Sequence, residues 1–163
     1  QKLKELCQRR GEYMIGVEPM PYSGIPDLKK AYQVVMASGC ENAMIILDSW
    51  HWVRADQPYD ILTKEIAKKV VSIQINDAYE RPYAAPVLRD ESMHDRLAPG
   101  TGCGNTAAFC RMLKEKGVEP KAMGVEVISD AILAKGVAAA AKFNFDNTVK
   151  VLQEGWPEAM PEK

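Results

Sequence analysis

Four oxygen-bearing side chains each stand at or near the end of a short apolar run in this chain. The runs span residues 14–18, 43–48, 70–75 and 122–127, and the side chains are those of Glu18, Asp48, Gln74 and Glu126. A carboxylate is costly to bury unless a partner compensates its charge. Carboxylate and amide oxygens are also the donors that Mg²⁺ and Mn²⁺ prefer. We therefore expect these four residues to share one divalent metal ion, provided that the fold brings them together.

A histidine between two tryptophans follows the second run. His51 comes three residues after Asp48 and is flanked by Trp50 and Trp52. An imidazole placed after a strand can hydrogen-bond a substrate oxygen or move a proton, and indole rings can stack on a sugar face. We expect His51 to be catalytic and the two indoles to contact substrate; a packed histidine in an aromatic cluster is the alternative.

The elements that must position these side chains alternate regularly along the chain. The four apolar runs are rich in Val, Ile and Met, which is typical of buried parallel strands. Asp27 and Asn105 stand where helix N-caps belong, and Gly39 and Gly117 stand where helices end. Helices are predicted over residues 2–10, 27–38, 60–69, 106–116 and 137–153. This alternation predicts an α/β fold with a parallel sheet.

The number of predicted strands is half of what a closed barrel needs. A parallel (β/α) barrel of TIM type gathers the carboxyl ends of its strands at one face, but a complete barrel takes about 250 residues. This chain has 163 residues. We therefore predict a half barrel of about four βα units over residues 1–155 and a tail over residues 156–163. A small doubly wound sheet is the alternative, although no glycine-rich phosphate motif supports it.

The longest irregular stretch, residues 76–104, follows the third predicted strand. Loops of more than about 12–15 residues without secondary structure are usually functional lids or disordered segments. This one carries aromatic residues, prolines and several arginines, and it ends in a Pro-Gly-Thr-Gly sequence. We expect it to cover a substrate.

Composition and charge limit the class of protein. The net charge of −1 gives no reason to expect a nucleic-acid or anionic-membrane partner. The sequence contains no apolar stretch of membrane-spanning length and does not open with a signal-peptide pattern. The four cysteines form neither a CxxC pair nor a zinc-site spacing, so we expect free thiols in the cytoplasm. Because Gln1 lies inside a predicted helix, we also expect a piece of a longer protein.

Five segments together resemble the C-terminal half of the sugar phosphate isomerase/epimerase family, the xylose isomerase-like TIM barrels. They are VEPMPYSGIPDLKKAYQVV, LDSWHWVR, VVSIQINDA, RLAPGTG and GVEVIS, within residues 17–153. The resemblance implies that Glu18, Asp48, Gln74 and Glu126 bind Mg²⁺, Mn²⁺ or a similar ion. It also implies that His51, in an Asp-x-x-His motif, and Arg96, ahead of a Pro-Gly sequence, contact substrate. The chain has Thr101 where the family usually has Glu.

The implied activity is isomerisation or epimerisation of a sugar or a related polyol or keto compound. The metal ion would polarise a carbonyl, and Glu18 and Glu126 would take and return the adjacent proton through an enediolate. If the substrate carries a hydroxyl beta to the carbon that loses this proton, that hydroxyl would leave as water instead. Because Gln74 occurs in the part of the family that includes dehydratases similar to 3-dehydroshikimate dehydratase, a lyase is the alternative.

A second class of function stays open, because a half barrel need not be active by itself. The chain could be a non-catalytic binding module or one part of a larger assembly. A half barrel exposes two strand edges and an apolar interior. We therefore expect either a homo-oligomer or a missing N-terminal half of the barrel, with a small-molecule sugar or keto acid as the ligand.

Overall fold

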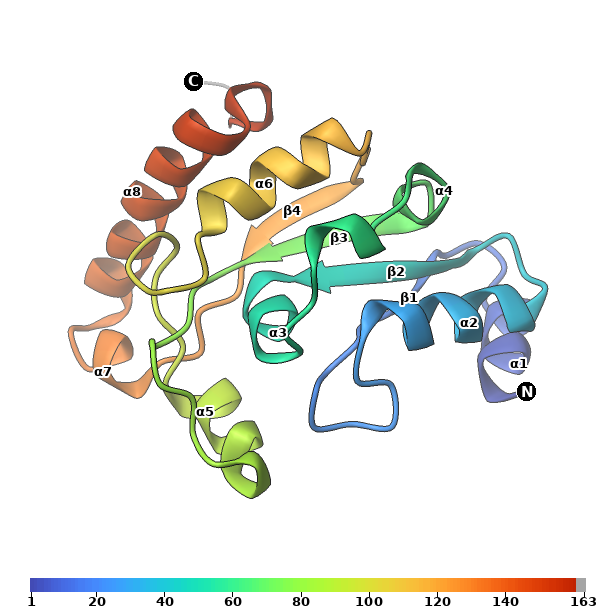
Figure 1. Ribbon diagram of the computed structural model, residues 1–163, viewed down its shortest axis with the longest axis horizontal. Helices are drawn as coiled ribbons and strands as arrows, with labels where there is room; N and C mark the ends of the chain where they lie inside the picture. The colour runs from blue at the N-terminus through green and yellow to red at the C-terminus, as the bar shows by residue number, and fades with distance from the viewer. Residues whose placement is uncertain (161–163) are drawn as a thin grey trace.

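One parallel sheet forms the centre of the molecule, for which a computed structural model describes residues 1–160 (Figure 1). Strands β1 (Ile15–Val17), β2 (Ala43–Asp48), β3 (Val70–Ile75) and β4 (Ala122–Val125) lie side by side in chain order. Each is parallel to its neighbour. The predicted α/β fold is confirmed. A doubly wound sheet reverses its strand order at one point, whereas this order runs straight through, as in the wall of a barrel.

Helices connect the strands and differ widely in length. They are α1 (Lys2–Arg9), α2 (Leu28–Ser38), α3 (Ser49–Arg54), α4 (Lys64–Ala67), α5 (Leu88–His94), α6 (Thr106–Glu115), α7 (Asp130–Leu133) and α8 (Val137–Gly155), with one-turn 3₁₀ helices η1 (Tyr59–Ile61), η2 (Ala85–Val87) and η3 (Pro157–Ala159). Among residues 1–160, none of these helices has the length and hydropathy needed to cross a membrane.

The two long predicted helices between strands begin and end as their sequences indicate. The Asp27 carboxylate accepts a hydrogen bond from the Lys30 N–H at the start of α2, and Gly39 ends that helix with φ of 66°. The Asn105 side chain accepts from the Ala108 N–H at the start of α6, and Gly117 follows with φ of 75°. Left-handed φ values of this kind favour glycine.

Two predictions about the connections are wrong. The predicted helix over 60–69 is instead η1 followed by the four-residue α4, because the Thr63 hydroxyl caps a new helix start at the Ile66 N–H. No helix is predicted over the segment of α3, and α5 lies within the stretch predicted to be irregular, but both segments are helical. Both are stabilised by distant side chains: the fully buried Glu91 of α5 accepts hydrogen bonds from Arg54 and Trp50 of α3.

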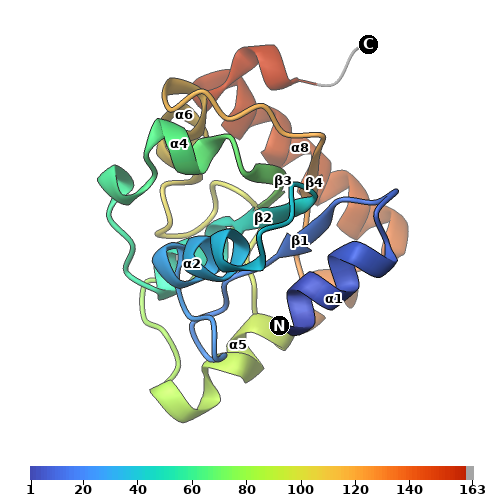
Figure 2. The ribbon, with the colours of Figure 1, turned by 90° about the vertical axis from the view of Figure 1, so that its right-hand side faces the viewer.

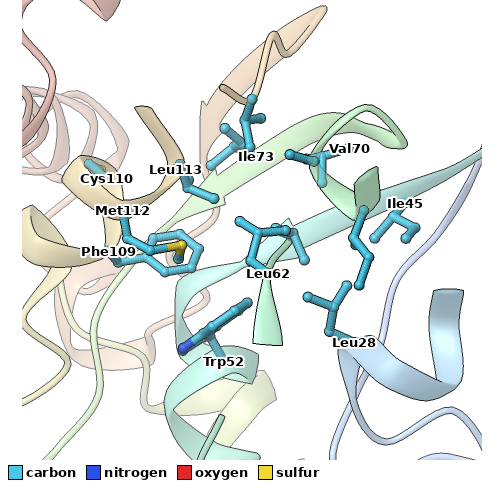
Figure 3. Packing of buried hydrophobic residues seen from close by; sticks show 14 of the residues in the cluster. Leu28, Ile45, Trp52, Leu62, Val70, Ile73, Phe109, Cys110, Met112 and Leu113 are labelled. Atoms are coloured by element: carbon cyan, nitrogen blue, oxygen red, sulfur yellow. The ribbon is translucent and has the colours of Figure 1, made fainter. Parts of the chain in front are cut away.

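The main core lies between the sheet and the helices on one side of it (Figures 2 and 3). Ile45 of β2 and Ile73 of β3 point toward Leu28, Leu62 and Leu113, and all five are fully buried. Alternate residues of the same strands, including Ile46 and Gln74, are only partly buried. Successive strand residues point to opposite faces, so the second face of the sheet carries the strand-end polar groups and is covered less completely than the first.

The first residues of the predicted tail continue the fold. After α8, Trp156, Ala159 and Met160 are partly buried against the core. The rest of the predicted tail, residues 161–163, lies outside the described residues.

Candidate functional site

The four predicted metal ligands lie at the carboxyl end of the sheet. Asp48 ends β2 and is paired in register with Gln74 of β3, and Glu126 directly follows β4. The Gln74 Nε2 donates to Glu126 Oε1 at 3.0 Å. Glu18 directly follows β1. The parallel strands thus bring all four side chains to the carboxyl end of the sheet, as the repeated sequence pattern predicted.

Asp48 is the most tightly held of these residues. Its Oδ1 accepts from the His51 N–H at 2.9 Å, and its Oδ2 accepts from Asn76 Nδ2 at 2.6 Å and from Arg96 Nη1 at 2.9 Å. Burial raises the pKa of this carboxyl above its ordinary range, while the Arg96 guanidinium and the donated hydrogen bonds oppose that rise. The carboxylate is therefore fixed in one orientation, in which Oδ1 accepts one hydrogen bond from the described residues.

The carboxyl group of Glu18 also has a raised pKa. Burial and the negative charges of Asp48 and Glu126 raise its pKa to about 7. Its Oε1 lies 3.4 Å from His51 Nε2, but that buried oxygen has no hydrogen-bond partner within residues 1–160. Burial likewise raises the pKa of Glu126, although Arg96 opposes this.

Arg96 supplies the positive charge of the site. Its side chain is only 2% exposed, and its Nη1 lies 2.9 Å from Asp48 Oδ2 and 2.8 Å from Glu126 Oε2. Ser92 holds the other side of the guanidinium: Nε donates to its carbonyl oxygen and Nη2 donates to its hydroxyl. Arg96 therefore faces the carboxylates, and its contact with a substrate remains a prediction.

His51 is buried beside the same carboxylates. Burial and the neighbouring Arg96 charge lower its pKa to about 3, so the imidazole is neutral at physiological pH. Its Nε2 lies 3.5 Å from Arg96 Nη2. Donor atoms of Glu18, Asp48 and His51 all lie within 4.8 Å of one another. The geometry therefore allows His51 either to meet a substrate oxygen or to join a metal ion.

The two indoles are packed rather than open to a ligand. Trp50 is fully buried, its Nε1 donates to Glu91 Oε1, and its ring lies 5.2 Å from that of His51. Trp52 points into the core, where its ring lies 5.5 Å from that of Phe109 (Figure 3). The prediction that Trp52 stacks on a substrate is corrected to a core role, because β2 and α3 turn it toward the helices. Trp50 forms the wall behind His51.

Asn76 and Ser92 belong to the site but were not among the predicted residues. Asn76 is fully buried and hydrogen-bonds Asp48. One signal pointed to it: it stands two residues after Gln74, and strand residues two apart share a face. No pattern in the sequence marks Ser92, which reaches the site only because α5 folds back against α3.

Donor atoms of Glu18, Asp48 and His51 lie close enough together to hold a metal ion, and Glu126 is not part of that group. When ionised, the carboxylates of Glu18, Asp48 and Glu126 leave two negative charges after Arg96 is counted. Among residues 1–160, the buried oxygens Glu18 Oε1 and Gln74 Oε1 have no hydrogen-bond partner. A cation with oxygen ligands would satisfy both oxygens and neutralise the remaining charge.

The raised pKa of Glu18 predicts a pH dependence of stability. Its folded pKa of about 7 lies above the ordinary value of 4.5, so the proton binds the folded state more tightly. The stabilisation is complete below pH 4.5 and is lost as the pH rises through 7. We expect the Tm of the metal-free parent minus the Tm of Glu18→Gln, both measured by circular dichroism, to fall as the pH rises over this range. A difference that is constant with pH would contradict the shift.

Comparison with known proteins agrees with this geometry. Residues 1–150 match the family model described as xylose isomerase-like TIM barrel. The chain is 28% identical over 134 residues to an inosose isomerase of Halalkalibacterium halodurans, covering 82% of this chain and 45% of that protein.

Two solved structures share the fold. A crystal structure of the IOLI protein with a bound zinc atom matches 98% of this chain and 55% of its own, with a TM-score of 0.77 at 22% identity. A structure of L-ribulose 3-epimerase matches 99% of this chain and 56% of its own, with a TM-score of 0.61 at 15% identity. The chain thus spans about half the length of these relatives, consistent with a half barrel. It belongs to the xylose isomerase-like TIM barrel family.

Proposed function

We propose that this chain supplies the metal-binding half of a sugar isomerase or epimerase that works by proton transfer. The observation that carries the proposal is that Glu18, Asp48, Gln74 and Glu126 lie at one end of the sheet, where two of their buried oxygens have no hydrogen-bond partner among residues 1–160. Membership of the family and the similarity to an inosose isomerase support the reaction class. The substrate would be a sugar or a related polyol or keto compound.

These four residues would hold the divalent cation. A set made of carboxylate and amide oxygens suits Mg²⁺ or Mn²⁺ better than the softer ions that nitrogen and sulfur ligands favour. If His51 joined the set, its nitrogen would make Zn²⁺ a stronger competitor, and the related IOLI structure does contain zinc. When bound, the cation would polarise the substrate carbonyl and make the neighbouring C–H acidic.

The chain's own carboxylates would move the proton. A base works best when its pKa lies near the operating pH, and the pKa of Glu18 is about 7. Glu18 in its ionised form would take the α proton from one side, leaving an enediolate, and Glu126 in its protonated form would return a proton from the other. The neutral His51 would hydrogen-bond a substrate oxygen, and Arg96 would limit the repulsion between Asp48 and Glu126.

A lyase is the second candidate, and Gln74 is the residue that favours it, because family dehydratases resemble the chain at this position. The first step is the same removal of an α proton. The electron pair left on the α carbon then forms a double bond, and the β-hydroxyl leaves and takes up a proton as water. The two outcomes differ in whether the substrate carries a β-hydroxyl that can leave.

Metal-dependent proton exchange tests the proposal. The complete natural protein that carries this chain would be titrated with Mn²⁺, then incubated in D₂O with ketoses, inososes and 3-dehydroshikimate. We expect Mn²⁺ to raise the Tm and deuterium to enter the α position of one substrate. Loss of water with a new ultraviolet absorbance would identify the lyase instead. Mn²⁺ binding without either reaction would identify a binding module.

A complete barrel is the second part of the proposal. The outer edges of β1 and β4 pair with no strand within residues 1–160. Large apolar side chains beside these edges are exposed, including Met14 (51%), Val125 (40%) and Phe145 (55%). Such edges and surfaces favour association. The partner would be an N-terminal half barrel or a second copy of the chain.

We therefore expect residues 1–163 alone to form dimers or to aggregate. Size-exclusion chromatography with light scattering measures this directly. A well-folded monomer that stays stable at high concentration would contradict the need for a second half.

A cytoplasmic location is part of the same proposal. Cys7, Cys40, Cys103 and Cys110 all lie within the described residues, and all four are free thiols. Free thiols are typical of a reducing compartment.

A further inference from the structure

We propose that Asn76 is the positioning residue of this site, orienting Asp48 directly and His51 through the start of α3. The inference rests on the proposed metal-dependent function and adds a residue to it. Asn76 directly follows β3 and is fully buried, and its side-chain amide contacts the ends of β2 and β4 as well as α3. It would contact neither the metal ion nor the substrate.

The donor side of the amide fixes Asp48. Asn76 Nδ2 donates to Asp48 Oδ2 at 2.6 Å and to the carbonyl oxygen of Glu126 at 3.1 Å. Both protons of the NH₂ group therefore have acceptors. One acceptor is a side-chain oxygen of a proposed metal ligand, and the other is the backbone carbonyl oxygen of a second proposed metal ligand. Asn76 thus sets the relative position of two strand ends and turns Asp48 so that Oδ1 keeps a free lone pair.

The acceptor side of the amide fixes the first turn of α3. Asn76 Oδ1 accepts from the Trp50 N–H at 2.6 Å and lies 2.7 Å from the Ser49 hydroxyl oxygen. The next N–H, that of His51, is capped by Asp48 Oδ1. Asn76 and Asp48 therefore satisfy consecutive N–H groups at the start of the helix that carries His51.

Backbone contacts anchor Asn76 itself. Its N–H donates to the Ser49 hydroxyl at 2.9 Å, and its carbonyl oxygen accepts from the Thr106 hydroxyl at 3.0 Å. A primary amide offers two donors and an acceptor in one plane. An aspartate here would place an acceptor against Asp48, and a leucine would leave Asp48 and the Trp50 N–H without these bonds. The chemistry of the position therefore calls for an amide.

Partners around a metal ligand commonly change metal affinity about 10–100-fold when they are removed. We expect Asn76→Ala to weaken Mn²⁺ binding by about that factor in calorimetry, at a temperature where circular dichroism shows the variant folded. Asn76→Ser, whose hydroxyl is too short to reach Asp48, is the second variant if Asn76→Ala does not fold.

Asn42 provides a matched control. Its side-chain amide also donates to neighbouring groups, the carbonyl oxygens of Cys7 and Tyr13, but it stands before β2, at the opposite end of that strand from Asp48. Asn42→Ala should lower the Tm and leave the Mn²⁺ affinity of the folded protein within about twofold of the parent, because it touches no proposed ligand.

A double-mutant cycle separates positioning from general destabilisation. If Asn76 acts through Asp48, Asn76→Ala should change the Mn²⁺ affinity far less in an Asp48→Asn background than in the parent. Equal losses in both backgrounds, or a loss no larger than that of Asn42→Ala, would overturn the inference.

A metal-free measurement keeps the inference separate from the proposed function. If the parent binds no Mn²⁺, the metal-dependent function fails, and amide hydrogen exchange then decides the role of Asn76. We expect Asn76→Ala to speed exchange of the His51 N–H, whose acceptor is Asp48, while Asn42→Ala leaves it unchanged. Unchanged His51 exchange in Asn76→Ala would show that Asn76 does not position Asp48.

Discussion

Replacing Glu126 by Gln is expected to abolish exchange of the substrate α proton with solvent while the fold is kept. The substitution preserves shape, but its single oxygen can replace only one of the two carboxylate oxygens: Oε1, which accepts from Gln74 Nε2, or Oε2, which accepts from Arg96 Nη1. It removes a negative charge from the proposed metal site, on which the acidity of the substrate C–H would depend, and it removes the carboxyl group that would carry the returned proton. We also expect Mn²⁺ affinity to fall by more than about 10-fold, because replacing a residue that only hydrogen-bonds to a metal ligand already lowers metal affinity by about that factor. Deuterium incorporation and Mn²⁺ calorimetry on the complete protein measure the two effects.

Glu154→Gln is the matched control for this experiment. Glu154 is exposed on α8, where its carboxylate lies 3.7 Å from Arg111, so its substitution should change neither metal binding nor exchange. If Glu126→Gln binds Mn²⁺ and exchanges protons like the parent, proton transfer by Glu126 is wrong. The chain would then be better explained as a binding module on a barrel fold.

Replacing His51 by Asn is expected to cut turnover, and by about 10²–10⁴-fold if His51 acts in proton transfer, the usual contribution of a general acid or base. His51 is neutral and buried, and its Nε2 faces Glu18 and Arg96. Asparagine keeps a hydrogen-bonding group but cannot carry a proton between oxygens. We expect Mn²⁺ affinity to change much less than turnover. Steady-state kinetics and calorimetry on the same preparation compare the two.

His94→Asn is the control for His51→Asn. His94 ends α5, is exposed, and contacts the exposed Asp130 at 3.1 Å, so its loss should leave turnover unchanged. A His51→Asn variant that loses Mn²⁺ binding and turnover together would make His51 a metal ligand. Normal turnover in that variant would remove His51 from the mechanism.

The strands and their polar ends could be predicted because they depend on short-range patterns. Continuous apolar runs indicated β2 and β3, and the carboxylates of Asp48 and Glu126 stood out because buried charges need partners. Parallel strands place their carboxyl ends at the same end of the sheet, so finding the strands was enough to group the four side chains. The caps at Asp27 and Asn105 are equally local.

The connections could not be predicted because distant contacts determine them. The helix α3 forms where aromatic residues gave no helical period, since Asp48 and Asn76 cap its first turn from β2 and from the end of β3. The position of α5 depends on Glu91 meeting Arg54, 37 residues earlier in the chain. Trp52 was assigned to substrate for the same reason: its neighbour Phe109 lies on α6 and is remote in the sequence.

Locating a bound ion by anomalous X-ray scattering tests the central claim most directly. Crystals of the complete protein grown with Mn²⁺ would be measured on both sides of the manganese absorption edge. We predict a single anomalous peak bounded by oxygens of Glu18, Asp48, Gln74 and Glu126. A map with no peak there, and with Arg96 Nη1 still bonded to both Asp48 and Glu126, would show that an arginine alone balances these carboxylates and would contradict the metal site.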